Sequence, residues 1–147
     1  MNVPCIDILL VEDDPDDIEL TKKAFESGEI TNRLRIVRDG QEAIDYLLNK
    51  GVYENEDEYS KPGLILLDIK LPKLSGIEVL KKIKSTPELK RIPVIMLTTS
   101  RQDQDILASY DNHANSYIEK PVEFSVFIKT IKNVGLYWAL TNTAPLA

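Results

Sequence analysis

Side chains able to bind metal ions or phosphate occur at the ends of short apolar runs in this sequence. Acidic, hydroxyl or basic residues follow four such runs, and they are Glu12, Asp13, Asp14, Asp68, Thr98 and Lys120. Carboxylate oxygens are the ligands preferred by a hard divalent cation such as Mg²⁺, and clustered carboxylates repel one another unless a cation is present. A lysine ammonium and a threonine hydroxyl can bind phosphate oxygens. These residue types therefore favour a site for magnesium and a phosphoryl group.

An aspartate in such a site can also act as a nucleophile, because Asp carboxylates form aspartyl phosphates in some proteins. Phosphoryl transfer requires mainly positioning and charge neutralisation, which a metal ion, Lys120 and Thr98 around Asp68 would supply. Taken singly, these residues also have structural explanations. Asp14 is a candidate helix N-cap before Pro15, and Thr98 alone is an ordinary β-branched strand residue. The functional interpretation depends on all of them lying together.

Two kinds of segment alternate along the chain and would position these residues. Short apolar, β-branched runs predict strands at 6–11, 34–37, 64–67, 94–97 and 116–118. Apolar residues at helical spacing predict helices at about 15–27, after Gly40, around 77–83, around 106–110, and from Phe124 to Val134. Strands that alternate with helices predict an α/β fold with a doubly wound parallel sheet, in which functional residues gather beyond the carboxyl ends of the strands.

The composition restricts the class of protein. The chain has 147 residues, which fit one domain, and 43% of them are apolar, which is enough for a hydrophobic core. A formal net charge of −6 disfavours a DNA-binding surface, because phosphate backbones bind basic patches. Cys5 is the single cysteine, which excludes an internal disulfide, and no apolar stretch approaches the ~20 residues of a membrane span. We therefore expect a cytoplasmic protein without a DNA or membrane partner.

Four motifs resemble the signature blocks of the response-regulator receiver domains of two-component signalling. They are LLVEDD at 9–14, LLDIKLPKLSG at 66–76, PVIMLTTS at 93–100 and YIEKP at 117–121. The motifs occur in the order that the family has, and the similarity covers about 6–134. The resemblance implies a flavodoxin-like, CheY-like sheet of five parallel strands in the order 2-1-3-4-5, with helices on both faces.

The resemblance also implies a phosphoacceptor and a metal site. Asp68 would accept a phosphoryl group from a histidine kinase, in a reaction that depends on Mg²⁺. Glu12, Asp13, Asp68 and the backbone carbonyl of Lys70 would hold the metal ion. Such a domain would promote its own phosphorylation and dephosphorylation, and it would act as a signalling domain rather than as an enzyme.

Further residues of the motifs would bind the phosphoryl group and transmit the signal. By resemblance, Thr98 and Lys120 would bind the phosphoryl oxygens, and Tyr117 would be an aromatic switch residue that turns inward when Thr98 moves. The resemblance further implies a cis peptide bond between Lys120 and Pro121. The signal would then pass through altered contacts with a downstream protein that the sequence does not identify.

The same resemblance to receiver domains suggests a domain organisation and binding partners for the chain. We expect a receiver domain over 1–138 with an extended fifth helix, a tail over 139–147 and no output domain. The acidic start at 11–17, the polar stretch at 50–62 and the aromatic extension resemble single-domain regulators that partner phytochrome-type histidine kinases. The polar stretch is either a solvated loop or an insertion that docks a partner.

Aromatic residues near the C-terminus point to self-association. An exposed cluster that contains Tyr137 and Trp138 would suggest an interface, so we predict a homodimer. The dimer would form through the helix around 106–110, the strand at 116–118, the fifth helix and this extension. The alternative is that Trp138 folds back on its own domain.

Three other classes of protein fit the sequence less well. A flavodoxin-like mononucleotide binder needs a Ser/Thr/Gly-rich phosphate loop after the first strand, where this chain is acidic. A phosphatase with an aspartyl nucleophile needs two aspartates spaced by one residue, whereas Lys70 occupies the second position after Asp68. A pseudo-receiver that binds partners without phosphate is disfavoured by the complete set of acids, threonine and lysine.

Overall fold

The computed structural model describes residues 6–54, 61–99, 102, 114 and 116–140. Within these residues, five parallel strands form one sheet in the order β2-β1-β3-β4-β5, so the predicted strand order is confirmed. The strands are β1 (Ile8–Val11), β2 (Leu34–Val37), β3 (Leu64–Asp68), β4 (Val94–Thr98) and β5 (Ser116–Glu119). Each begins and ends within two residues of the predicted run.

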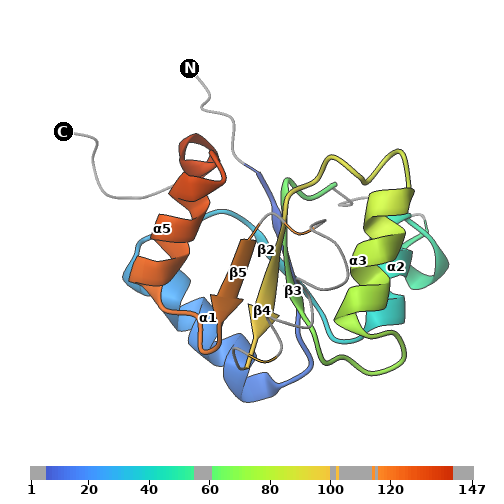
Figure 1. Ribbon diagram of the computed structural model, residues 1–147, viewed down its shortest axis with the longest axis horizontal. Helices are drawn as coiled ribbons and strands as arrows, with labels where there is room; N and C mark the ends of the chain where they lie inside the picture. The colour runs from blue at the N-terminus through green and yellow to red at the C-terminus, as the bar shows by residue number, and fades with distance from the viewer. Residues whose placement is uncertain (1–5, 55–60, 100–101, 103–113, 115, 141–147) are drawn as a thin grey trace.

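Helices cover both faces of the sheet, which confirms the doubly wound α/β architecture (Figure 1). The described helices are α1 (Pro15–Ser27), α2 (Gly40–Leu47), α3 (Gly76–Ser85) and α5 (Phe124–Asn133). In Figure 1, α1 and α5 lie on one side of the sheet, and α2 and α3 lie on the other. The helix predicted around 106–110 lies outside the described residues. Among those that are described, no helix is both long and apolar enough to cross a membrane.

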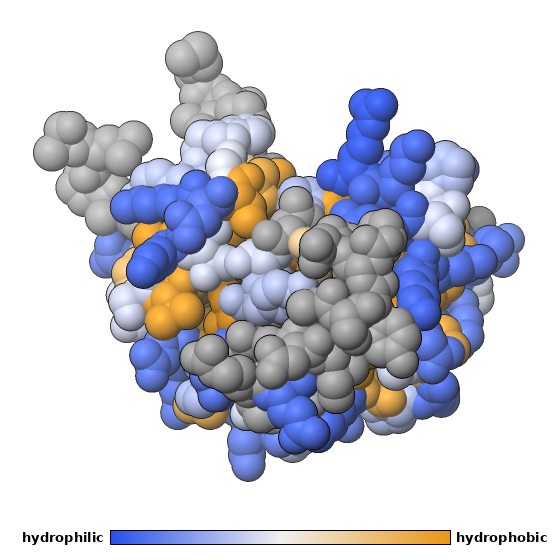
Figure 2. Space-filling view, viewed as in Figure 1, coloured by the Kyte–Doolittle hydropathy of each residue, from blue (hydrophilic) through white to orange (hydrophobic). Residues whose placement is uncertain are grey.

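Each face of the sheet has its own hydrophobic core. Side chains alternate along β1, so that Ile8 and Leu10 join the core under α1 and α5, whereas Leu9 and Val11 join the core under α2 and α3. A parallel sheet covered on both faces needs such continuous apolar strands. The surface is accordingly mostly hydrophilic in Figure 2, with smaller hydrophobic patches on the left, over α5.

Polar residues at the carboxyl edge of the sheet also begin the helices. The Asp14 side chain accepts a hydrogen bond from the Asp16 amide (2.8 Å), and Pro15 occupies the first position of α1. The Ser75 hydroxyl accepts a hydrogen bond from the Glu78 amide (3.2 Å) at the start of α3. The prediction that Asp14 caps the first helix is confirmed.

Helix α5 ends at Asn133, so the predicted extension of the fifth helix through Trp138 is wrong. Gly135 has a φ of 77°, in the left-handed region that favours glycine. Its amide and that of the next residue donate to carbonyls of the last helical turn at 3.1 and 3.0 Å, which is a Schellman motif. A separate 3₁₀ helix, η2 (Tyr137–Ala139), follows this turn.

The segment after α5 packs onto the core through Ala139, Leu136 and Leu140, whereas Tyr137 and Trp138 stay outside the core. Ala139 is fully buried, and the Asn32 amide donates to the carbonyls of Ile6 (2.8 Å) and Ala139 (2.9 Å). Tyr137 and Trp138 remain 51% and 60% exposed. Trp138 therefore does not fold into the core of its own domain.

A groove of about 560 Å³ lies at the amino edge of the sheet, away from the carboxyl edge that carries the predicted site. It is lined by residues that precede β1, β3 and β4, namely Ile6, Gly63 and Pro93, and by Trp138 on the other side. The C-terminal segment therefore reaches the end of the sheet opposite to the predicted site.

The polar stretch at 50–62 begins with a 3₁₀ helix, η1 (Gly51–Tyr53). The Tyr53 ring packs edge-on against Tyr46, with 5.1 Å between the ring centroids, and the Arg35 guanidinium lies over both rings. Residues 55–60 lie outside the described part of the chain. The choice between a solvated loop and a docking insertion therefore stays open.

Candidate functional site

The parallel sheet brings the predicted residues to one edge. Because β1 and β3 are neighbours in register, Glu12 after β1 lies next to Asp68 at the end of β3. The Lys120 amide donates to the Thr98 carbonyl (2.6 Å), which joins the ends of β5 and β4 at the same edge. The sequence prediction that these four residues share an edge is confirmed.

Three carboxylates converge at the centre of this edge. Glu12 and Asp68 are buried, whereas Asp13 is exposed. Each of the three offers one carboxylate oxygen, and these oxygens all lie within 4.8 Å of one another. The structure thus brings together the side chains predicted to hold a metal ion.

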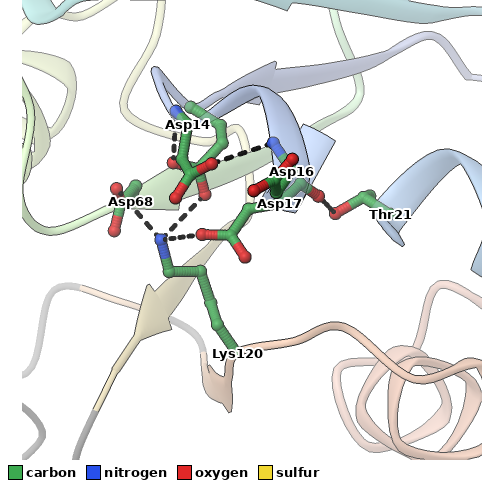
Figure 3. Close-up of polar contacts among 7 residues, drawn as sticks. Asp14, Asp16, Asp17, Thr21, Asp68 and Lys120 are labelled. Atoms are coloured by element: carbon green, nitrogen blue, oxygen red, sulfur yellow. Dashed lines mark hydrogen bonds and ion pairs between the residues drawn. The ribbon is translucent and has the colours of Figure 1, made fainter. Parts of the chain in front are cut away.

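The Lys120 ammonium lies among three carboxylates. Its Nζ is 3.0 Å from Glu12 Oε1, 2.9 Å from Asp17 Oδ2 and 3.3 Å from Asp68 Oδ2. Figure 3 shows the Lys120 side chain reaching toward Asp68 and Asp17 from the other side of the cluster. Only 8% of this side chain is exposed, so its three N–H donors point at protein acceptors rather than at bulk water.

The burial of so many charges changes their pKa values. Burial, followed by the charge of Asp68, raises the pKa of Glu12 to about 7, although the hydrogen bond and charge of Lys120 oppose this shift. Burial also raises the pKa of Asp68, against the lowering effect of Lys120. For Lys120, burial disfavours the charged form, but hydrogen bonds to Asp17 and Glu12, together with the charges of Asp68 and Glu12, outweigh it and raise the pKa of the ammonium. The ammonium therefore stays charged, while the carboxylates carry more negative charge than it offsets.

The loop between β3 and α3 holds Asp68 in place through close backbone packing. The Gly76 amide donates to the Ile69 carbonyl (2.7 Å). A Cβ on Gly76 would lie only 2.1 Å from the Asp68 carbonyl oxygen, so only glycine fits there. The Lys70 amide also hydrogen-bonds the Asp68 carboxylate, and the Lys70 side chain itself is exposed. The motif that ends in Gly76 thus positions the candidate acceptor.

A family match accompanies this arrangement of acids, lysine and threonine. Residues 8–132 match the response regulator receiver domain family. The chain belongs to this receiver family. Its fold is therefore the CheY-like receiver fold, and the protein is a signalling domain of the two-component type.

Phytochrome-associated regulators are among the receivers similar to this chain. Response regulator Rcp1 of Synechocystis sp. is 43% identical over 140 residues, which cover 95% of this chain and 93% of that protein. The structure of its Mn²⁺-bound form has a TM-score of 0.72 at 42% identity and covers 96% of this chain and 99% of that one.

Two further solved receivers are similar. The bacteriophytochrome response regulator AtBRR has a TM-score of 0.86 at 47% identity, with 94% of this chain and 98% of that chain covered. The phosphorylated cyanobacterial phytochrome response regulator RcpA has a TM-score of 0.73 at 45% identity, with 91% and 94% covered. The predicted resemblance to regulators of phytochrome-type kinases is therefore confirmed.

The two predicted switch residues of this receiver lie on adjacent strands. Thr98 is fully buried at the end of β4. Tyr117 lies on β5 and is partly buried against the core beneath α2 and α3. The predicted cis bond between Lys120 and Pro121 is confirmed. The movement of Thr98 and Tyr117 stays a prediction.

One contact of the receiver site was missed by the sequence analysis. Asp17 lies in the first turn of α1 and forms the shortest of the three ion pairs to Lys120. Acidic residues are common in a first helical turn because they interact favourably with the helix dipole, so Asp17 carried no distinct signal. The sequence held one weak indication of its role. Asp17 lies three residues after the N-cap Asp14, and this spacing places it on the same side of the helix as the cap.

Proposed function

We propose that this receiver is a response regulator of a two-component phosphorelay in which Asp68 accepts a phosphoryl group from a sensor histidine kinase. The observation that carries the proposal is the buried Asp68 carboxylate at 3.3 Å from the Lys120 ammonium, beside two further acids. Phosphoryl transfer depends mainly on positioning and charge neutralisation, and this arrangement supports both. The phosphorylated structure of the relative RcpA is in line with it.

In the proposed step, a carboxylate oxygen of Asp68 attacks the phosphorus of a phosphohistidine. The O–P bond forms as the N–P bond breaks, and the electron pair of the N–P bond stays on the imidazole nitrogen. Lys120 and the Thr98 hydroxyl would bind the phosphoryl oxygens and offset their charge. Later attack of water on phosphorus would release inorganic phosphate and restore the carboxylate, so the domain would promote both its phosphorylation and its dephosphorylation.

A magnesium ion would be held by Glu12, Asp13 and Asp68, with the backbone carbonyl of Lys70 as a further ligand. The side chains fit a hard divalent cation because they are all oxygen donors and lie close together. Burial is the main reason that the pKa values of Glu12 and Asp68 are raised, and a divalent ion bound beside them would favour their ionised forms. When bound, the ion would neutralise charge on the acceptor and on the phosphoryl oxygens. The relative Rcp1 has a solved Mn²⁺-bound form, which supports the binding of a divalent ion by this chain.

The signal would leave through protein contacts. Thr98 would move toward the phosphoryl group, and Tyr117 would then turn inward and change the surface formed by β5 and its neighbours. The proposed partners are a phytochrome-type histidine kinase in the cytoplasm, an unidentified downstream protein and a second copy of this chain. The proposed organisation is a receiver domain over 1–138 followed by a tail over 139–147.

Intact mass spectrometry tests this function directly. The wild-type protein is incubated with Mg²⁺ and acetyl phosphate or phosphoramidate, in parallel with Asp68→Asn and with wild type in excess chelator. We expect one added phosphate on the wild type and none in the other two samples. An unmodified wild type would instead support the pseudo-receiver, and phosphate on Asp68→Asn would place the acceptor elsewhere.

A further inference from the structure

Asp17 contacts Lys120 but has no part in the proposed chemistry. Its Oδ2 lies 2.9 Å from the Lys120 Nζ, and its side chain is 23% exposed. Figure 3 shows the Asp17 carboxylate, from the start of α1, and the Asp68 carboxylate, from the end of β3, on either side of the Lys120 ammonium. The ammonium is thus held from two elements that are far apart in the sequence.

The three carboxylates around Lys120 would bind different ligands in the proposed function. Glu12 would bind the metal ion, and Asp68 would bind both the ion and the phosphoryl group. A divalent cation beside the ammonium also repels it, because like charges at short range disfavour one another. Asp17 alone has no other proposed ligand, so its negative charge remains available to Lys120 throughout the cycle.

The local structure fixes the backbone from which the Asp17 side chain projects. The Thr21 hydroxyl donates to the Asp17 carbonyl (2.9 Å), and Thr21 is buried. The cap formed by Asp14 fixes the first turn of α1 from its other end. Asp17 therefore projects from a rigid turn, whereas Lys120 has a long flexible side chain that needs external support.

We propose that Asp17 is a positioning residue that holds the Lys120 ammonium beside Asp68 while the metal ion and the phosphoryl group engage the other two carboxylates. This inference rests on the proposed function. It assigns to Asp17 an effect on the rate of phosphoryl transfer, exerted through Lys120 rather than by contact with the phosphoryl group.

The substitution Asp17→Asn keeps the shape of the side chain and removes its charge. Because the substitution removes the negative charge that attracts the Lys120 ammonium at short range, we expect about tenfold slower phosphorylation by acetyl phosphate. Asp16→Asn is the matched control. Asp16 lies in the same turn and is exposed, and it is absent from the ion pairs of Lys120 among the described residues. Its variant should react within about twofold of wild type, as expected for an exposed charge.

Three additional measurements separate positioning from a general structural effect. In protein labelled with ¹⁵N at lysine Nζ, the ammonium signal of Lys120, assigned by its loss in Lys120→Arg, should shift in Asp17→Asn and not in Asp16→Asn. Asp17→Glu restores the charge and should recover part of the rate. The melting temperatures of Asp17→Asn and Asp16→Asn should remain similar.

The outcomes distinguish this inference from the proposed function. If Asp17→Asn matches Asp16→Asn in rate and in the Lys120 signal, the positioning role is wrong even though Asp68 is phosphorylated. The role is equally wrong if the rate falls only together with the melting temperature and Asp17→Glu recovers nothing. If the wild type gains no phosphate, the proposed function fails, and the positioning role, which rests on that function, fails with it.

Discussion

Glu12 is a buried carboxyl group whose pKa is strongly changed by its surroundings in the site. It is almost fully buried, and burial with the nearby charge of Asp68 raises its pKa from 4.5 to about 7. Lys120 alone cannot offset two buried carboxylates together with Asp17. In metal-free protein, ionisation of Glu12 therefore works against the folded state.

This raised pKa predicts a pH dependence of stability. In the absence of divalent metal, the unfolded chain releases the Glu12 proton near pH 4.5, whereas the folded protein retains it until about pH 7. The contribution of Glu12 to the free energy of unfolding is thus complete below pH 4.5 and is lost as the pH rises to about 7. Urea denaturation with chelator at several pH values should show this fall in wild type and a flatter profile in Glu12→Gln. If wild type and Glu12→Gln showed the same dependence of stability on pH, the pH dependence could not be assigned to Glu12.

The positions of site residues could be predicted from the sequence where the backbone alone determines them. Asp68, Thr98 and Lys120 end or follow strands, and parallel strands necessarily bring such ends together. Asp17 was missed because its partner Lys120 lies more than one hundred residues away. Only the packing of α1 against the sheet determines which side chain of its first turn faces the lysine.

At the scale of single elements, the start of α3 is packed most tightly against the site. Gly76, the first residue of α3, touches the backbone of Asp68 itself. Ser75, directly before it, contributes a side-chain cap that accepts a hydrogen bond from the Glu78 amide. The two neighbours therefore affect the helix and the acceptor differently.

Alanine at these two positions should separate their roles. Gly76→Ala forces the Asp68 backbone to move, and we expect a loss of about 1–3 kcal/mol in the free energy of unfolding together with slower phosphorylation. Ser75→Ala removes only a cap, which should lower stability by about 1 kcal/mol and leave phosphorylation unchanged. Urea denaturation and the acetyl phosphate assay measure both effects. Equal phosphorylation rates for the two variants would show that Gly76 does not position Asp68.

The end of α5 shows where element prediction failed. Apolar spacing predicted the helix only as far as Val134, and its extension through Trp138 rested on the resemblance to single-domain regulators. The left-handed Gly135 ends the helix instead, and a glycine directly after the apolar pattern was the signal for that end. The strand order also followed from resemblance to the family, since periodicity does not determine which strands are neighbours.

At the scale of the whole molecule, the exposed aromatic residues fit the predicted homodimer. Trp138 and Tyr137 stay largely exposed although neighbouring residues pack into the core. We expect sedimentation to detect a dimer, and Trp138→Lys to weaken it at least about tenfold, because aromatic residues dominate interface energies. Val52→Lys, at a 91% exposed position on η1, is the control and should have no effect. A protein that stays monomeric at high concentration, with and without an acyl-phosphate mimic, would contradict the dimer.

The place of Trp138 gives the protein a built-in optical probe. It is the only tryptophan of the chain, so intrinsic indole emission comes from this one position. The indole lines the groove beside residues that precede the strands, whereas Asp68 ends a strand at the opposite edge. A change of emission on phosphorylation would therefore report either a rearrangement that has travelled the length of the sheet or burial of the indole in the predicted dimer, without the quenching by nearby chemistry that complicates a fluorophore inside an active site.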